Sequence, residues 1–452
     1  MKEKSNNFSS KIGFVLAAAG SAVGLGNLWR FPYLAAKYGG GMFLLIYLVL
    51  ALTFGFTLMI TEIAIGRKTG KSAIAAFSSL NKKYSFIGYL ACIVPVLIFP
   101  YYCVIGGWVL KYVAVFARNE VAAATDNSYF GNFIAQTGEP LIWLSIFMIV
   151  CAVVVIMGVQ KGIEKASKLL MPVLIVLSVI IAVYVCTLDG AMEGIVYFLK
   201  PDFSRFSFNA VLAAMGQLFY SMSLAMGIMI TYGSYLNRKD SLDSSVKQIE
   251  IFDTGIAFIA GLIIIPSVFA FSGGDESALG QGPGLMFITL PNVFANMAMG
   301  RVIGLLFFVL VLFAALTSAI SLMETIVSII EDLVHWSRVK ITLCVLAFSL
   351  LLAVPSSLGN GLWAHVQLFG MGILDFFDFI SNSILMPVVA LLTCFFVGYV
   401  LKPAVVIEEV ERNGETFGRK KIYGILLKFV APVCLVLILI TSILTVLGMI
   451  SL

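Results

Sequence analysis

Charged residues are scarce in this sequence, in which aspartate, glutamate, lysine and arginine make up 12% of 452 residues. Hydrophobic residues make up 60% of the chain. A soluble domain needs a polar surface, so this composition excludes one and indicates a chain that crosses a membrane many times. The net charge of +5 reflects an uneven distribution of basic loops and does not indicate a nucleic-acid partner.

Cysteine and histidine are also rare, and neither forms a catalytic or metal-binding pattern. The seven cysteines all fall within hydrophobic segments, so no outer loop holds a disulfide pair. The two histidines, His335 and His365, lie outside the predicted middle of the membrane. Gly24-Leu25-Gly26 lacks the third glycine and the preceding strand of a dinucleotide fingerprint. We therefore expect neither an enzyme nor an organic cofactor.

Long hydrophobic runs are what the sequence has in abundance. Runs of about 20 apolar residues, enough to cross a bilayer as a helix, recur to the end of the chain. The first run follows a polar start, so we do not expect a cleaved signal peptide. The expected fold class is all-α, with eleven spans at about 12–35, 41–66, 86–116, 141–158, 163–187, 209–236, 249–271, 301–331, 338–355, 372–399 and 423–449.

Lysine and arginine predict the orientation of these spans. The N-terminus and the loops after even-numbered spans hold most of them, whereas the other side holds seven: Arg30, Lys37, Lys111, Arg118, Lys200, Arg205 and Arg301. Basic loops stay in the cytoplasm. We therefore expect a protein of the cell membrane with a cytoplasmic N-terminus and, after eleven spans, an extracytoplasmic C-terminus.

The first span contains a stretch that is unsuited to a continuous helix. Residues 20–27 hold three glycines and the amide of Asn27. Ala22 is 11 residues beyond Lys11, or about 16 Å, which is close to the bilayer midplane. Unwound backbone persists at that depth only where protein or a water-filled cavity satisfies it. The stretch therefore predicts a break that binds a small ion and an amino acid.

A second polar, glycine-containing interruption lies in the sixth span, between Gly216 and Gly227. Breaks five spans apart are typical of two inverted five-helix repeats with the substrate site between them. We expect one transmembrane domain over residues 1–452, with repeats at about 12–187 and 209–399 and an additional helix at about 423–449.

Three other segments lead to predictions. Glu62, near the inner end of span two, needs a partner that unwound backbone N–H groups could supply. The apolar residues 285–288 in a long outer loop favour a lid that dips back into the protein. Gly162 and Pro172 could make the start of span five unwind, or could mark a plain helix start.

Together these motifs resemble the neurotransmitter:sodium symporter family, particularly its bacterial amino-acid members. The resemblance extends from span one to span ten and is carried by Ala22 through Asn27 with Trp29-Arg30-Phe31-Pro32, Gly39-Gly40-Gly41, Gln217 through Gly227, and Leu316-Thr317-Ser318. It implies broken helices one and six and Na⁺-coupled uptake of a neutral, hydrophobic L-amino acid by alternating access.

The resemblance also implies two sodium sites. The first would use the Ala22 carbonyl, the Asn27 amide, Ser221, Asp253 and the substrate's carboxylate. The second would use the carbonyls of Gly20, Val23 and Ala314 with the hydroxyls of Thr317 and Ser318. Hard cations need several oxygens, which a membrane core supplies from unwound backbone and from Ser, Thr, Asn or Asp. Each hydroxyl taken singly could instead bond to its own helix.

The implied substrate site surrounds Gly24. Amine transporters of the family carry an aspartate there, so Gly24 leaves space for a carboxylate that the substrate brings, held by the half-helix ends and the Tyr102 hydroxyl. The implied contacts are Ala22, Gly24, Gly26, Ile98, Tyr102, Tyr220, Ser221, Ser223, Met226, Ser318 and Leu322. Tyr220 replaces a usual phenylalanine and Ala225 a usual glycine, which predicts a narrower, more polar pocket.

Two charged or polar pairs are implied as gates. Arg30 and Asp378 would close the outer side, and Tyr235 and Asp332 would form a cytoplasmic latch. The family's arginine–tryptophan pair near the N-terminus reads Ser5 and Phe8 here. We therefore expect the latch to rest on the neighbouring Lys4 or to be weaker.

Chloride dependence is the last expectation. Animal members of the family need Cl⁻ near the first sodium site, but Ala257 replaces the serine that would complete a chloride site, and Asp253 brings a fixed carboxylate. We expect transport without Cl⁻, with Asp253 as the chloride substitute. Two alternatives stay open: a transporter of the same fold for another solute, and an ion-triggered sensor or channel.

Overall fold

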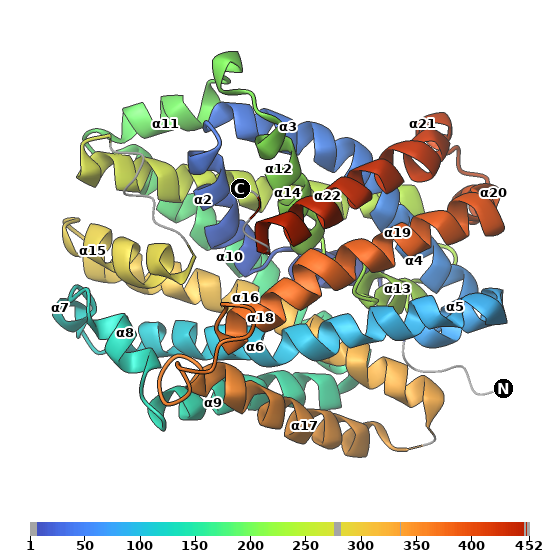
Figure 1. Ribbon diagram of the computed structural model, residues 1–452, viewed down its shortest axis with the longest axis horizontal. Coiled ribbons are helices and arrows are strands. Elements are labelled where there is room, and N and C mark those ends of the chain that lie inside the picture. Colours follow the sequence, from blue (N-terminus) through green and yellow to red (C-terminus); the bar gives the residue numbers. More distant parts are fainter. Residues whose placement is uncertain (1–6, 275–281, 335, 447–448, 450–452) are drawn as a thin grey trace.

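The computed structural model describes residues 7–274, 282–334, 336–446 and 449. Within these ranges the chain consists of helices and their connections, and β-structure is limited to two isolated bridges, Gly40 with Pro201 and Leu368 with Met371. A helix satisfies its own backbone hydrogen bonds where water is absent, which suits so apolar a chain. The predicted all-α fold class is confirmed (Figure 1).

Nine segments among the described residues are long and apolar enough to cross a membrane. They are Gly41–Thr69 (α3 Gly41–Leu50, α4 Phe56–Thr69), Lys82–Ala117 (α6 Ser85–Ala117), α9 Glu139–Ile156, Val159–Cys186 (η4 Val159–Glu164, α10 Lys165–Cys186), α14 Leu242–Ser272, α16 Gly300–Leu333, α17 Arg338–Leu358, Ile373–Val400 (α18 Ile373–Asp378, η8 Phe379–Leu385, α19 Met386–Phe395) and Lys420–Val446 (α21 Lys420–Ile425, α22 Ala431–Val446).

The other two expected spans are the ones in which interruptions were predicted, and both are split into shorter helices. The first span is a pair of helices, α1 Lys11–Ala22 and Gly26–Lys37 (η1 Gly26–Arg30, α2 Phe31–Lys37), bent by 53° at the break. The segment predicted as 209–236 is also split, into α12 Phe208–Ser221 and α13 Ile228–Ser234. Neither half is long enough to cross on its own, so the described residues give at most ten spans by length and composition, and the expected count of eleven is not reached.

Short helices connect the long ones. They are α5 Ala73–Leu80, α7 Val121–Ala124, α8 Tyr129–Ile134, α11 Ala191–Leu199, α15 Leu290–Ala295 and α20 Ala404–Val410. The segment from Gly162 to Pro172, for which two alternatives were open, is helical: the π-helical turn η4 continues directly into α10, which contains Pro172.

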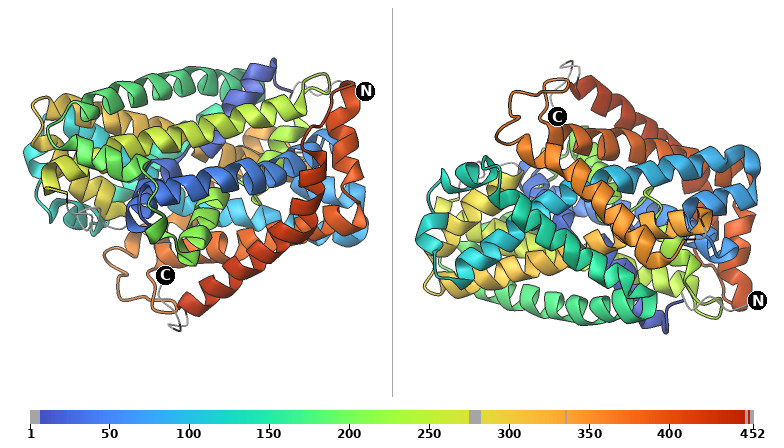
Figure 2. Two further views of the ribbon diagram at one scale, coloured as in Figure 1. Left: turned by 90° about the horizontal axis from the view of Figure 1, so that it is seen from above. Right: turned by 90° about the horizontal axis from the view of Figure 1, so that it is seen from below.

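Some of the long helices lie at the centre of the bundle and others at its periphery. The 33-residue α6 and the 34-residue α16 lie against each other near its centre (Figure 1). The last segment, α21 and α22, lies on the outside, red in Figure 2, and only 17% of its apolar stretch is buried. Large apolar side chains are exposed on α10, α17 and α22, as expected for surfaces that face lipid.

The second break lies between α12 and α13, and α13 is held in place by close contact with α4. A Cβ on Gly66 would lie 1.9 Å from the Ile230 carbonyl oxygen, and one on Gly233 would lie 2.4 Å from the Ile63 carbonyl oxygen. Backbones in membrane proteins approach this closely where small residues line both faces. These glycines therefore hold α13 against α4, directly below the second break.

We predict that Gly66→Ala destabilises the protein, because the new methyl group must push the α4 and α13 backbones apart. Such overpacking costs about 1–3 kcal/mol of the free energy of unfolding. The matched control is Gly424→Ala in α21, where no atom lies within 4 Å of the added Cβ. Thermal unfolding of the purified protein would measure both; equal midpoints for the two variants would contradict the close contact.

Candidate functional site

The first break exposes backbone groups that side chains from other helices satisfy. Val23, at the end of α1, is extended. The N–H of Gly24 then donates to Asn27 Oδ1 at 3.1 Å, and the N–H of Leu25 donates to the Tyr102 hydroxyl at 3.3 Å. The Gly26 carbonyl accepts from Gln217 Nε2 at 2.8 Å. The break is therefore tied to both α6 and α12.

The second break, between α12 and α13, is built on left-handed backbone. The φ angles of Ser223, Ala225 and Gly227 are +53°, +60° and +75°. The N–H of Ala225 donates to Glu62 Oε1 at 2.7 Å, so the prediction that unwound backbone binds Glu62 is confirmed. The Ser223 hydroxyl donates to the Ser21 carbonyl at 2.9 Å, which joins the two breaks.

A cavity of about 30 Å³ lies between the two breaks. All the residues that the resemblance implies for substrate contact line it: Ala22, Gly24, Gly26, Ile98, Tyr102, Tyr220, Ser221, Ser223, Met226, Ser318 and Leu322. Ser21, Leu25 and Ile228 also line it and were missed, although Ser21 and Leu25 directly adjoin predicted positions and Ile228 is two residues from Met226. The expected residues therefore converge on one place.

Ala225 is different from these residues, because it is not among those that line the cavity. Its backbone is turned toward Glu62 on α4. The expectation that its methyl group narrows the pocket is therefore wrong. Its effect falls on the backbone, which adopts a left-handed conformation that costs a non-glycine residue about 1–2 kcal/mol.

The polar residues assigned to the first cation site meet around Asp253, which is fully buried on α14. Its Oδ1 accepts from Asn27 Nδ2 at 2.8 Å and from Ser221 Oγ at 2.6 Å, and its Oδ2 accepts from the Tyr47 hydroxyl at 3.3 Å. Ala22 lines the same cavity as Ser221. A carboxylate and a hydroxyl oxygen suit a hard cation, although the amide oxygen of Asn27 here accepts from Gly24.

The second set of oxygens lies between the end of α1 and the middle of α16. Ser318 Oγ lies 3.3 Å from the Gly20 carbonyl, 3.0 Å from the Ser21 carbonyl and 3.3 Å from the Val23 carbonyl. Thr317 Oγ1 donates to the Ala314 carbonyl at 3.1 Å, so this hydroxyl is bonded to its own helix. The five assigned residues are together, and the Ser21 carbonyl adds an oxygen that was not foreseen.

The outer gate differs from the expected ion pair. No salt bridge joins Arg30 and Asp378 among the described side chains. Instead the Arg30 guanidinium lies over the Tyr220 ring, 5.5 Å from its centre, while Asp378 accepts from the Tyr101 hydroxyl at 3.0 Å and from Asn382. Tyr220 lines both the inner cavity and an outer cavity of about 280 Å³ that Arg30 also lines.

The predicted lid is present above this gate. Phe287, in the π-helical turn Leu285–Thr289, is fully buried, and its ring contacts Trp29, Trp108 and Phe130. The Tyr112 hydroxyl donates to the Phe287 carbonyl at 2.8 Å. The apolar run therefore packs into an aromatic cluster; residues 275–281 of the same loop are outside the described ranges.

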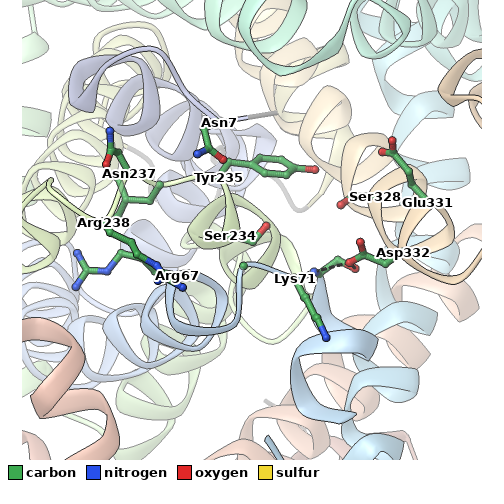
Figure 3. Close-up of a pocket in the computed structure, with 13 residues that line it drawn as sticks. Asn7, Arg67, Lys71, Ser234, Tyr235, Asn237, Arg238, Ser328, Glu331 and Asp332 are labelled. Carbon is green, nitrogen blue, oxygen red and sulfur yellow. Dashed lines mark hydrogen bonds between the residues drawn. The ribbon is translucent and has the colours of Figure 1, made fainter. Parts of the chain in front are cut away.

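The two residues predicted for the cytoplasmic latch, Tyr235 and Asp332, line one inner cavity of about 320 Å³ (Figure 3). Their printed hydrogen bonds go to different partners. Asp332 accepts from the N–H and the hydroxyl of Ser72 at 2.8 and 2.6 Å, where it caps the start of α5. The Tyr235 hydroxyl donates to Glu324, which forms an ion pair with Arg338. Lys4 and Ser5 lie outside the described residues.

Comparisons with known proteins show what this chain is similar to. A family model described as the sodium:neurotransmitter symporter family matches residues 5–132 and 116–449. An uncharacterized sodium-dependent transporter of Bacillus subtilis, YhdH, is 34% identical over 97% of each chain, and one of Haemophilus influenzae is 33% identical over 96% of this chain and 97% of that one. The crystal structure of MhsT in complex with L-phenylalanine has a TM-score of 0.87 and 36% identity, covering 97% of this chain and 99% of that chain.

We predict that Ala225→Gly raises the free energy of unfolding by up to about 1 kcal/mol, because glycine adopts the left-handed conformation without steric cost. Substrate selectivity should stay unchanged, since Ala225 does not line the cavity. The matched control is Ala260→Gly in the middle of α14, which should lose about 1 kcal/mol. Thermal unfolding and ligand competition would measure these effects. Parallel destabilisation of both variants would contradict a strained Ala225.

Proposed function

This chain belongs to the sodium:neurotransmitter symporter family and is a Na⁺-dependent membrane transporter, and from that premise we propose that it takes up a neutral L-amino acid by alternating access. The observation that carries the proposal is the place of Gly24. A Cβ on Gly24 would lie 2.7 Å from Ser318 Oγ and 3.0 Å from the Tyr102 hydroxyl, so a backbone without a side chain faces two hydroxyl groups.

A substrate carboxylate fits this place better than any other group. The half-helix that starts near Gly26 presents its positive end there, and Tyr102 supplies a hydroxyl donor. No acidic side chain lines the cavity among the described residues, so the negative charge must come from the substrate. The relative solved with L-phenylalanine supports an amino acid as the substrate class.

The substrate side chain would lie among Ile98, Met226 and Leu322, which favours an apolar side chain. A cavity of about 30 Å³ has room for a water molecule or two. A bulky side chain therefore requires Tyr220 or Met226 to change conformation, and the ring of Tyr220 already lies within 2.5 Å of a Cβ built on Gly26. We infer that binding and closure of the site are the same event.

Two Na⁺ ions would accompany the substrate, one beside Asp253 and one between α1 and α16. The first set offers a buried carboxylate and the Ser221 hydroxyl, and the second offers three carbonyls of α1 around Ser318. At about 100 mV each Na⁺ that enters contributes roughly 2.3 kcal/mol, so two ions support steep accumulation. We also propose that the N-terminus lies in the cytoplasm and, after eleven spans, the C-terminus outside, because basic loops stay on the cytoplasmic side.

Radiolabelled uptake into proteoliposomes tests this proposal. We expect a Na⁺ gradient to drive accumulation of a neutral L-amino acid, with competition by apolar amino acids and none by amines that lack a carboxylate. Accumulation of a carboxylate-free solute instead would favour a same-fold transporter for another substrate. Currents far above the turnover of a carrier would favour an ion channel.

We predict that replacing Thr317 and Ser318 together by alanine raises the Na⁺ concentration for half-maximal binding about tenfold or more, because two oxygen ligands are lost. The carbonyls of Gly20, Val23 and Ala314 remain, so the fold should persist. The control is Thr325→Ala two turns along α16, whose hydroxyl donates to the Ser321 carbonyl in the same way. Native Na⁺ affinity in the double variant would refute the second site.

We predict that uptake continues unchanged when gluconate replaces chloride. Asp253 already supplies the negative charge beside the first cation, and Ala257, one turn along α14, supplies no hydroxyl for an anion. We further propose that Asp253 takes up a proton when Na⁺ leaves, which makes return of the empty carrier sensitive to pH.

Asp253→Asn is the variant that tests this assignment, because it removes the fixed charge and keeps the shape. We expect its remaining uptake to depend on chloride. Native uptake that collapses in gluconate would contradict the proposal, and so would an Asp253→Asn variant that is as indifferent to the anion as the native protein.

A further inference from the structure

The start of α1 is bonded to one carboxylate at the start of the fifth span. Glu164, in the π-helical turn Val159–Glu164, is 2% exposed. Its Oε2 accepts from the Ser9 N–H at 2.7 Å, and its Oε1 accepts from the hydroxyls of Ser9 and Ser10 at 2.5 and 3.2 Å. Lys168, one turn along, donates to Oε1 at 2.6 Å and balances the charge. Four donors therefore converge on Glu164.

Two further contacts fix the same place. A Cβ on Gly13 would lie 2.1 Å from Glu164 Oε1, so the carboxylate occupies the space that any side chain at residue 13 would need. Gln160, in the same turn, donates to the Asn7 carbonyl at 2.8 Å. Ser10 in turn accepts from the Gly13 N–H at 3.1 Å and caps α1. Glu164 thus holds the capped N-terminus of a helix, where a negative charge is favourable.

The two residues expected in the latch also bond to neighbouring helices. Asp332 accepts from Ser72 at the start of α5, and the Tyr235 hydroxyl donates to Glu324 on α16. Tyr235 makes two contacts with the N-terminal segment. Its carbonyl accepts from the Phe8 N–H at 3.1 Å, and its ring packs against the Phe8 ring. Phe8 therefore packs against Tyr235, and Glu164 supplies a charged contact to the neighbouring Ser9.

We propose that Glu164 is the inner latch of this transporter: a positioning residue that holds α1 closed on the cytoplasmic side. The proposal rests on the proposed function, because α1 carries the Gly20 and Val23 carbonyls of the second Na⁺ site. When the start of α1 leaves Glu164, these carbonyls move away from Ser318 on α16, and the Na⁺ site and the cytoplasmic path open together. Release of the start of α1 and opening of the Na⁺ site at its end are therefore one conformational change.

Two variants break the latch by different means. Glu164→Gln keeps the size of the side chain but replaces one acceptor oxygen by an NH₂ group. The hydrogen bonds that this oxygen accepted are therefore lost. Gly13→Ala keeps every hydrogen-bonding group and forces the carboxylate out of its place, while alanine favours the helix. The controls are Glu139→Gln, which breaks the outer Lys111–Glu139 ion pair, and Gly424→Ala, whose added Cβ meets no atom within 4 Å.

Hydrogen–deuterium exchange of the full-length protein in lipid nanodiscs measures the latch directly. We expect both Glu164→Gln and Gly13→Ala to speed amide exchange over residues 10–16 about tenfold, since charge-assisted hydrogen bonds are lost. We also expect both to raise the Na⁺ concentration that half-stabilises the protein against heat. The two control variants should exchange like the native protein. Gly13→Ala decides the matter alone if Glu164→Gln does not fold.

Two results would overturn the proposal. One is native exchange over residues 10–16 in both variants, and the other is faster exchange there in Asp332→Asn than in Glu164→Gln. Failure of the proposed function looks different: the native protein would show no stabilisation by Na⁺, yet exchange in Na⁺-free buffer would still rise in the latch variants.

Discussion

The structure depends on one constraint, which is that backbone groups freed inside a membrane must find partners without water. Two helices are broken here, and side chains accept from freed N–H groups at both breaks. Asn27 serves Gly24, Tyr102 serves Leu25, and Glu62 serves Ala225. These three acceptors lie in η1, α6 and α4, and Gln217 of α12 donates to the freed Gly26 carbonyl. The two breaks therefore fix the positions of α4, α6 and α12 around them.

The same constraint places partial charges of opposite sign on the two sides of the first break. The end of α1 presents three carbonyls around Ser318, and a helix C-terminus carries partial negative charge. A few residues further, the next half-helix presents its positive end toward the cavity at Gly24 and Gly26. One interruption therefore offers a place for a cation on one side and for a carboxylate on the other. The Na⁺ ion and the amino acid that we propose as ligands would need these two places at once, and a broken helix supplies both without added charged side chains.

The sequence predicted the features that arise from local composition. Glycines near Ala22 and Gly227 indicated both breaks, and the family resemblance predicted most of the residues that line the cavity. The failures involve side chains whose partners are set by tertiary packing. Asp332 was assigned to the latch, and its bonds to the N–H and the hydroxyl of Ser72 at the start of α5 were not foreseen. Ala225 was assigned to the pocket because it neighbours residues that line it, whereas its left-handed backbone turns it toward Glu62. Glu164 carried no signal, since its importance arises from Gly13, 151 residues earlier in the chain.

The outer side is closed by rings more than by charges, and the energetics of desolvation explain why. A salt bridge at this depth would require both ions to lose water, a cost that Coulomb attraction often fails to offset. Arg30 is instead half-buried over the Tyr220 ring, a contact that leaves the guanidinium partly hydrated. Tyr220 is the common wall of the inner and outer cavities, so a rotation of this one ring joins them. The same ring also lies against Gly26 at the first break, 2.5 Å from where a Cβ would be. One side chain therefore belongs both to the outer aromatic contact and to the cavity in which we propose that substrate binds.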